Sequence, residues 1–207
     1  SYMAVYGKPH TAIRTSLWIN QNVPVGSVIL REHWEEGVPD LFEYQIRELP
    51  LYENDTPEKL RDLSKELEGA DYIMFFSSRL YGTVPRLPVR YPLSSAYYRM
   101  LFSGDLGYEL VNVETAYPQV LGVTFANNTL TRPELPEPRG IKNVISPGLV
   151  LDLGFADESF SVYDHPVGLL FENKANLTAG SIRRIIENAV PSAELLAEKG
   201  PEQQATG

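Results

Sequence analysis

The chain has 207 residues, of which 43% are hydrophobic and 22% charged, which is enough to bury the core of one compact domain and excludes a disordered or collagen-like chain. Its 18 basic and 27 acidic residues leave a net charge of −9, which disfavours nonspecific binding of nucleic acid because such binding depends on clustered Lys and Arg. The chain has no cysteine, which excludes disulfide scaffolds, thiolate zinc sites and cysteine nucleophiles.

Hydrophobic spacing predicts alternating helices and strands. In chain order, the expected elements are a helix at 11–20, a strand at 27–31, a helix at 57–68, a strand at 72–76, a helix at 94–103, strands at 108–114 and 120–125, a short extended piece at 149–153, strands at 160–163 and 167–172, and a last helix that begins at 177–178. We expect residues 35–54 to be irregular, since they are acidic and contain Gly and Pro.

The helix at 57–68 has the clearest pattern. Thr56 stands at the N-cap and Pro57 at the first helical position. Three leucines follow at spacings of three and four, and Gly69 ends the helix. The residues at 72–76 are then continuously apolar, which is typical of a strand covered on both faces.

This order of elements predicts an α/β fold. We expect a three-layer Rossmann-like sandwich, with a mostly parallel sheet and antiparallel strands at its edge. Residues 1–190 are expected to form a single α/β domain, with a long Pro- and Gly-rich excursion at 126–156. Residues 191–207 are expected to be a flexible tail.

Several catalytic motifs are absent from the sequence: the dinucleotide fingerprint, the P-loop, the HExxH zinc motif and the nucleophile elbow. The acidic group that comes nearest to a metal site is Glu53-Asn54-Asp55, just before a predicted helix. The helix dipole explains carboxylates at that position more simply than a metal ion does. We therefore assign no catalytic residue, no metal site and no cofactor to the chain.

Glu32 and His33 follow the first predicted strand at its carboxyl end, where ligands bind in open α/β sheets. A histidine beside carboxylates is suited to act as a general base or a metal ligand. We favour the alternative of a loop histidine bonded to a neighbouring carboxylate, because neighbours in sequence need not converge in space. His165, between Asp164 and Pro166, is expected to lie in a tight connection between strands.

Residues 72–104 contain no Asp or Glu but several Arg and Tyr residues, and Arg79 and Tyr81 again follow the end of a strand. Guanidinium groups suit phosphate or carboxylate, and tyrosine rings suit sugars or lipid headgroups. The alternative is that the arginines bind loop carbonyls and the acidic 35–54 segment. The candidate ligand-binding residues are Arg79, Tyr81, Arg86, Arg90, His33 and Glu32.

Several phrases of the sequence resemble a family of membrane enzymes. They are WINQNVPVGS at 18–27, RLYG at 79–82, PRLP at 85–88, RYP at 90–92 and FSVYDHP at 160–166. The first resembles the passage in which membrane-embedded glycosyltransferases enter their C-terminal domain. The others resemble large multispan proteins of Chloroflexi and archaea that are similar to dolichyl-phosphate-mannose-dependent mannosyltransferases. The resemblance covers about residues 6–172, and the Pro-rich excursion is its least familiar part.

The resemblance implies an enzyme that takes a sugar from a polyprenyl-phosphate donor at the outer membrane face. In such enzymes the catalytic acidic residue lies in a loop between the first transmembrane helices, a region that this sequence does not match, so no catalytic residue can be transferred. We expect a soluble extracytoplasmic accessory domain that is inactive alone. Its expected partners are the transmembrane part of the same polypeptide and a lipid headgroup or lipid-linked sugar. A start at Ser1 without a leader pattern favours an excised segment.

Two other functions stay open at this point. One is a free-standing α/β protein that binds a phosphorylated small molecule through Arg79, Arg86 and Arg90, which predicts that these three guanidinium groups converge in one cleft. The other is a protein–protein interaction module, for which a large exposed apolar patch would be the marker.

Overall fold

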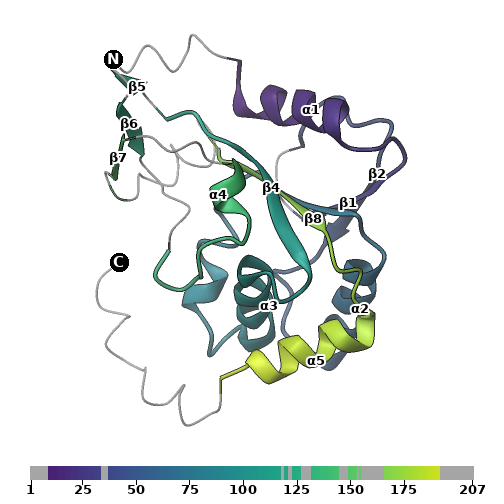
Figure 1. Ribbon diagram of the computed structural model, residues 1–207. Coiled ribbons are helices and arrows are strands. Elements are labelled where there is room, and N and C mark those ends of the chain that lie inside the picture. Colours follow the sequence, from purple (N-terminus) through teal and green to yellow (C-terminus); the bar gives the residue numbers. More distant parts are fainter. Residues whose placement is uncertain are drawn as a thin grey trace.

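The structure is a computed structural model, and it describes residues 9–33, 37–117, 119–120, 123–126, 132–144, 149–152, 154 and 166–191. It is an α/β protein with one five-stranded mixed sheet and one three-stranded sheet (Figure 1). The α/β class predicted from the sequence is therefore confirmed. No helix in the described part is both long and apolar enough to cross a membrane.

The helices are α1 (Thr11–Asn22), α2 (Pro57–Glu68), the 3₁₀ turn η2 (Val84–Arg86), α3 (Pro92–Ser103), α4 (Ile141–Val144) and α5 (Ala179–Ala189). The larger sheet contains β1 (Val28–Glu32), β2 (Gln45–Leu49), β3 (Tyr72–Phe75), β4 (Tyr108–Glu114) and β8 (Gly168–Asn173). The smaller sheet contains β5 (Gln119–Val120), β6 (Val123–Ala126) and β7 (Leu149–Asp152).

The larger sheet has the strand order β2-β1-β3-β8-β4. Strand β1 pairs in parallel with β2 and with β3, whereas β8 runs antiparallel to both β3 and β4. The sequence predicted antiparallel strands at the edge of the sheet, and edge strand β4 does pair antiparallel with its neighbour β8. The other edge strand, β2, is parallel to β1. Strand β8 itself lies inside the sheet, and its residues Leu169, Leu170 and Phe171 are all fully buried, as in a strand with neighbours on both sides.

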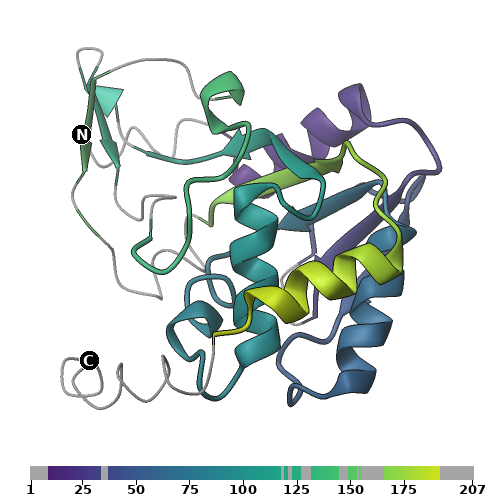
Figure 2. The ribbon, with the colours of Figure 1, turned by 60° about the horizontal axis from the view of Figure 1, so that its bottom comes forward.

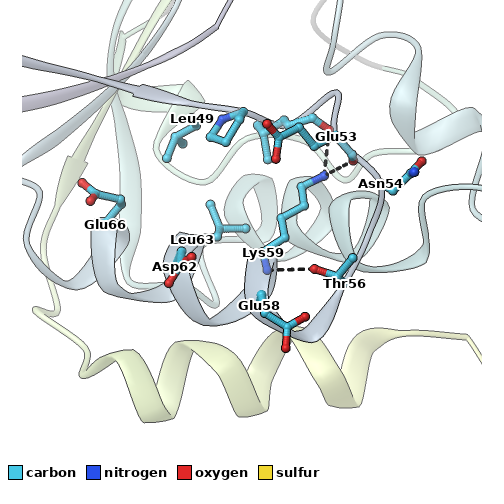
Figure 3. Close-up of a pocket in the computed structure, with 11 residues that line it drawn as sticks. Leu49, Glu53, Asn54, Thr56, Glu58, Lys59, Asp62, Leu63 and Glu66 are labelled. Atoms are coloured by element: carbon cyan, nitrogen blue, oxygen red, sulfur yellow. Dashed lines mark hydrogen bonds between the residues drawn. The ribbon is translucent and has the colours of Figure 1, made fainter.

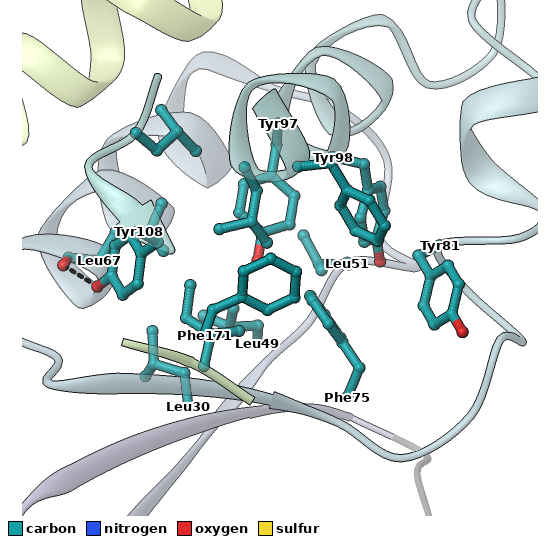
Figure 4. Packing of buried hydrophobic residues seen from close by; sticks show 14 of the residues in the cluster. Leu30, Leu49, Leu51, Leu67, Phe75, Tyr81, Tyr97, Tyr98, Tyr108 and Phe171 are labelled. Carbon is teal, nitrogen blue, oxygen red and sulfur yellow. Dashed lines mark hydrogen bonds between the residues drawn. The ribbon is translucent and has the colours of Figure 1, made fainter. Parts of the chain in front are cut away.

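Helices cover both faces of this sheet (Figures 1 and 2). Helix α1 lies on one face, where Ile19 packs with Met74 and Leu170. Helices α2, α3 and α5 lie on the other face over the larger core, in which Phe75 and Phe171 meet the tyrosines of α3 (Figure 4). The alternation of side chains along each strand divides the apolar residues between these two clusters.

Helix α1 approaches the sheet closely through small side chains. A Cβ atom on Gly168 of β8 would lie 2.5 Å from the hydroxyl oxygen of Thr15, so glycine is required there for α1 to pack as it does. Ile13 and Leu17, which the sequence places on one face of α1, lie on its exposed side, with exposed fractions of 46% and 51%. The face of α1 that is buried carries Thr15 and Ser16 together with Ile19.

The termini of α2 match the sequence prediction. Thr56 is the N-cap, and its hydroxyl accepts a hydrogen bond from the Lys59 amide at 3.1 Å. Pro57 occupies the first turn and Gly69 the C-cap. Thr178 likewise caps α5. These signals are local, which is why they could be recognised without knowledge of the fold.

Two segments differ from the sequence prediction. Residues 45–49, expected to be irregular, form edge strand β2. The strand expected at 120–125 is instead a hairpin of β5 and β6 in the smaller sheet, which β7 completes within the Pro- and Gly-rich excursion. The strand expected at 160–163, His165, and most of the tail expected at 191–207 lie outside the described residues.

Candidate functional site at the carboxyl edge of the sheet

The parallel strands β1 and β3 end at the same edge of the larger sheet. Glu32 is the last residue of β1, and His33 follows it. Residues 77–82 leave the end of β3 and lead toward η2. Because this is the edge at which open α/β sheets bind ligands, these residues form the candidate site.

Glu32 is buried at this edge and has only 1% of its surface exposed. The hydroxyl of Tyr98, a fully buried residue of α3, donates a hydrogen bond to Glu32 Oε1. The Tyr98 ring packs against the rings of Tyr97 and Phe75, with centroid distances of 5.0 Å and 6.1 Å. A buried carboxyl group is costly unless it is hydrogen-bonded, so the Glu32–Tyr98 pair attaches α3 to the end of β1.

Residues 77–82 turn sharply after β3. Ser77 and Ser78 are buried, and the Arg79 amide donates a hydrogen bond of 3.3 Å to the Ser77 hydroxyl. The Gly82 amide donates to the Ser78 carbonyl at 2.8 Å. Arg79 is half-buried beside these two serines. The segment therefore brings two hydroxyl groups and a guanidinium-bearing residue to the end of the sheet.

Tyr81 was predicted to contact a ligand, and the structure places it largely in the core. Its ring lies 5.7 Å from Phe75 and 5.6 Å from Phe102, measured between centroids. Figure 4 shows the Tyr81 ring at the border of this cluster. The guanidinium carbon of Arg132 lies 5.6 Å from the centre of the same ring, which is a cation–π distance.

Arg132 is a site residue that the sequence did not identify. A Cβ atom on Gly82 would lie only 2.9 Å from the Arg132 guanidinium carbon, so the absence of a side chain at Gly82 lets Arg132 approach. Arg132 comes after strands β5 and β6 in the sequence, far from the other residues of this edge. Its sequence neighbourhood carries no motif, and only the tertiary fold brings it to Tyr81.

Arg86 and Arg90 have partners of their own. Arg86 Nε lies 4.0 Å from a carboxylate oxygen of Glu134. The guanidinium of Arg90 lies over the Tyr91 ring, 5.1 Å from its centre. These contacts correspond to the structural alternative for the arginines, although the carboxylate that Arg86 meets belongs to the Pro-rich excursion and not to the 35–54 segment.

His33 does not share an environment with Glu32. His33 Nδ1 lies 2.5 Å from Glu48 Oε2 on the neighbouring strand β2, and Arg31 lies 2.5 Å from the other oxygen of the same carboxylate. Hydrogen bonds from Arg31 and His33 lower the pKa of Glu48. His33 is thus bonded to a carboxylate, but this carboxylate belongs to Glu48 of β2 and not to a neighbour of His33 in the sequence. Glu32 is bonded instead to Tyr98 of α3.

Asp55, which the sequence considered as part of an acidic metal site, has a structural role. Its Oδ2 accepts hydrogen bonds from the Leu93 and Ser94 amides, at 2.7 Å and 3.0 Å, and so caps the start of α3. Its Oδ1 lies 3.0 Å from Lys59 Nζ. Burial lowers the pKa of Lys59. Within the described residues, no group of three or more His, Asp or Glu side chains could hold a metal ion.

Comparisons with protein-family models, with curated proteins and with solved structures find no match to this chain. The carboxyl edge combines a buried carboxyl group, two serine hydroxyls and the basic residues Arg79 and Arg132. The carboxyl group and the two serines are buried, whereas Arg79 and Arg132 are partly exposed and are of a residue type that suits an anionic ligand.

Proposed function

We propose that this chain is the extracytoplasmic accessory domain of a multispan glycosyltransferase that uses a polyprenyl-phosphate sugar, and that it is not catalytic alone. The observation that carries the proposal is the position of the family phrase at 79–82, which lies at the carboxyl edge beside the Glu32–Tyr98 pair. In an open α/β fold, this is the part of the molecule in which ligand contacts are expected.

The headgroup of such a donor is a phosphate joined to a sugar. Guanidinium groups at positions 79 and 132 suit the phosphate, because their planar donors match its oxygens. Ser77, Ser78 and Glu32 are buried beneath this edge, so we propose that they hold the loop and α3 in place and do not contact the sugar. The role that we propose for the domain is to hold this headgroup while the transmembrane part performs the transfer.

The alternative function is a free-standing protein that binds a phosphorylated small molecule through Arg79, Arg86 and Arg90. It receives less support, since Arg86 lies against Glu134 and Arg90 against Tyr91. Neither contact turns the guanidinium group toward a shared phosphate.

We also propose that the fold is a three-layer Rossmann-like sandwich. Helix α1 on one face of the sheet and helices α2, α3 and α5 on the other support this classification (Figure 2). The parallel pairing of β1 with β2 and β3 supports it as well.

The coding sequence provides the first test. If the proposal is correct, the gene region upstream of the Ser1 codon encodes a series of apolar segments of about 20 residues each. A gene that begins at this segment, with no apolar segments before it, would overturn the proposal.

Binding provides the second test. The domain is titrated with nanodiscs that contain polyprenyl-phosphate mannose, and with nanodiscs of the same lipid without it. Arg132→Gln should weaken binding about tenfold, because it removes one charge-assisted contact, whereas the exposed Arg183→Gln on α5 should not change it. Equal binding to both nanodiscs, or transfer of mannose by the isolated domain, contradicts the proposal.

A further inference from the structure

The loop between η2 and α3 presents apolar and basic side chains together at the surface. Leu87 and Val89 are large hydrophobic residues with exposed fractions of 40% and 72%. Arg86 and Arg90 flank them in the sequence and are exposed as well. We call residues 86–90 the arginine loop. Neighbouring apolar side chains that stay in contact with water gain hydrophobic stabilisation only if a partner covers them.

The fold holds the arginine loop in a fixed shape. Val84 before it and Tyr91 after it are both buried, and the Ser95 hydroxyl donates a hydrogen bond of 2.9 Å to the Val84 carbonyl. The Leu87 amide donates to the Val84 carbonyl, and the Tyr91 amide to the Leu87 carbonyl, each at 2.9 Å. The turn is therefore preformed, so binding through it costs little conformational entropy.

The arginine loop belongs to a basic part of an acidic chain. Residues 72–104 contain four arginines and no Asp or Glu, whereas the whole chain has a net charge of −9. Other cations near α3 have their charges directed inward. Arg99 is half-buried and donates to a carbonyl at the end of α5. Lys59 has a side chain that is only 7% exposed, and its ammonium group donates to the Leu51 and Glu53 carbonyls, at 2.9 Å and 2.7 Å (Figure 3).

Arg86 and Arg90, in contrast, keep their charges at the surface. The Arg86 side chain is 60% exposed, and the 4.0 Å between its Nε and Glu134 is the limit of an ion pair, so this contact contributes little. Arg90 lies over the Tyr91 ring and makes no ion pair with any residue that the structure describes. Both guanidinium groups can therefore bind phosphate without the loss of a buried contact.

We propose that the arginine loop docks the domain on an anionic lipid surface. Arg86 and Arg90 pair with the phosphates of separate lipids, while Leu87 and Val89 insert at the boundary between headgroups and acyl chains. The charges are complementary, since an anionic surface attracts nearby cations, and the acidic remainder of the chain is screened beyond about 8 Å at physiological salt. A protein partner would need acidic and apolar groups in a matching arrangement, whereas fluid lipids adapt to the loop.

This docking has a consequence for the candidate site at the carboxyl edge. Gly82 and Arg86 are four positions apart, which corresponds to at most about 14 Å of chain. A domain held by the arginine loop therefore keeps that edge close to the lipid surface, where a lipid-linked headgroup lies. This consequence rests on the proposed function, whereas the contact with lipid does not.

The test is co-sedimentation of the chain with vesicles at physiological salt. One set contains phosphatidylglycerol and phosphatidylcholine, the other phosphatidylcholine alone, and neither contains a sugar donor. The double variant Arg86→Gln/Arg90→Gln should bind the anionic vesicles about thirtyfold more weakly, because each arginine near such a surface contributes roughly fivefold. The double variant Arg183→Gln/Arg184→Gln removes two exposed charges of α5, so its net charge is the same, and it should bind like the wild-type chain.

Insertion of the apolar side chains is tested separately. Leu87→Ser/Val89→Ser should weaken binding about tenfold, whereas Ile13→Ser/Leu17→Ser, which changes exposed apolar residues of α1, should not. The chain has no cysteine, so Val89→Cys and Leu17→Cys each carry a single nitroxide label. On anionic vesicles, the label at position 89 should become accessible to oxygen and protected from a water-soluble relaxant, and the label at position 17 should stay in water.

Four results would overturn the proposal. Equal binding to both sets of vesicles, or equal weakening in the two arginine pairs, would mean that the loop does not recognise anionic lipid. A label at position 89 that stays in water while the chain binds would mean that another surface docks. Self-association that the loop variants abolish would mean that the loop binds a second copy. Each result concerns the arginine loop alone, because the vesicles lack the donor that the nanodisc titration tests.

Discussion

Asp55 and Lys59 form the most buried ion pair in the described part of the chain, with exposed side-chain fractions of 4% and 7%. Asp55 caps α3, while Lys59 extends from α2 and also binds two loop carbonyls. One carboxylate therefore connects the starts of two helices and the loop before α2. Removal of one partner of such a pair leaves a buried charge without compensation.

We predict that Asp55→Ala lowers the free energy of unfolding by about 3–5 kcal/mol, because it leaves the Lys59 charge unpaired and the α3 amides uncapped. Denaturation in urea measures this change. Asp62→Ala is the matched control, since its side chain is 69% exposed, and it should change stability by less than about 1 kcal/mol. Similar losses in both variants would contradict the role given to Asp55.

Tyr108 should make the free energy of unfolding depend on pH in the alkaline range. Burial raises the pKa of Tyr108, and its hydroxyl donates a hydrogen bond of 2.6 Å to the Leu67 carbonyl. An unfolded tyrosine ionises near pH 10, whereas the folded one keeps its proton at that pH. The unfolded state is therefore favoured progressively above about pH 10, and the contribution of Tyr108 is complete below that value.

We predict that the free energy of unfolding falls between about pH 9.5 and pH 11, and that it falls less steeply in Tyr108→Phe. Lys59 acts in the opposite direction, because burial lowers its pKa, so the comparison of the two proteins isolates Tyr108. Urea denaturation at each pH measures both slopes. Parallel curves would show that Tyr108 ionises equally in both states.

The elements differ in how far local sequence determines them. Helix α2 could be predicted to the residue, since Thr56, Pro57 and Gly69 act within one or two turns. Strand β2 could not be predicted in this way, because its sequence QIREL is mostly polar. It forms a strand through its pairing with β1. The exposed Ile13–Leu17 face of α1 also depends on tertiary packing, in particular on the contact with Gly168.

The close contact between α1 and β8 leads to a prediction for Gly168→Ala. The new methyl group would lie 2.5 Å from Thr15 Oγ1, so we expect a loss of about 1–3 kcal/mol in the free energy of unfolding. Thr15→Ala removes that oxygen, and the double variant should lose less than the sum of the two single variants. Thermal denaturation of all four proteins measures the coupling.

Gly180→Ala is a control for Gly168→Ala. Gly180 lies in α5, and a methyl group added to it would have no atom within 4 Å, so alanine there should stabilise the chain by about 0.5–1 kcal/mol.

The outcome that would contradict the Gly168→Ala prediction is additivity. If the effects of Thr15→Ala and Gly168→Ala simply add, α1 can shift away from the sheet without cost.

At the scale of the whole molecule, the sequence predicted the class of fold and the edge that carries the candidate site. Parallel strands end together, and this rule alone brings Glu32 and Arg79 to one edge. It could not identify Tyr98 or Arg132, because their positions depend on the packing of α3 and on the path of the chain through the smaller sheet. It also could not place β8, whose partners are far from it in sequence.

The insertion of β8 between β3 and β4 has a consequence for how the chain folds on the ribosome. Strands β3 and β4 are synthesised before β8 but have no direct pairing with each other, since β8 separates them. Until β8 has emerged, each of them has an unpaired edge that can recruit a strand from another chain. Nascent chains that stop before Gly168 should therefore aggregate readily, because the sheet is complete only once β8 has been synthesised.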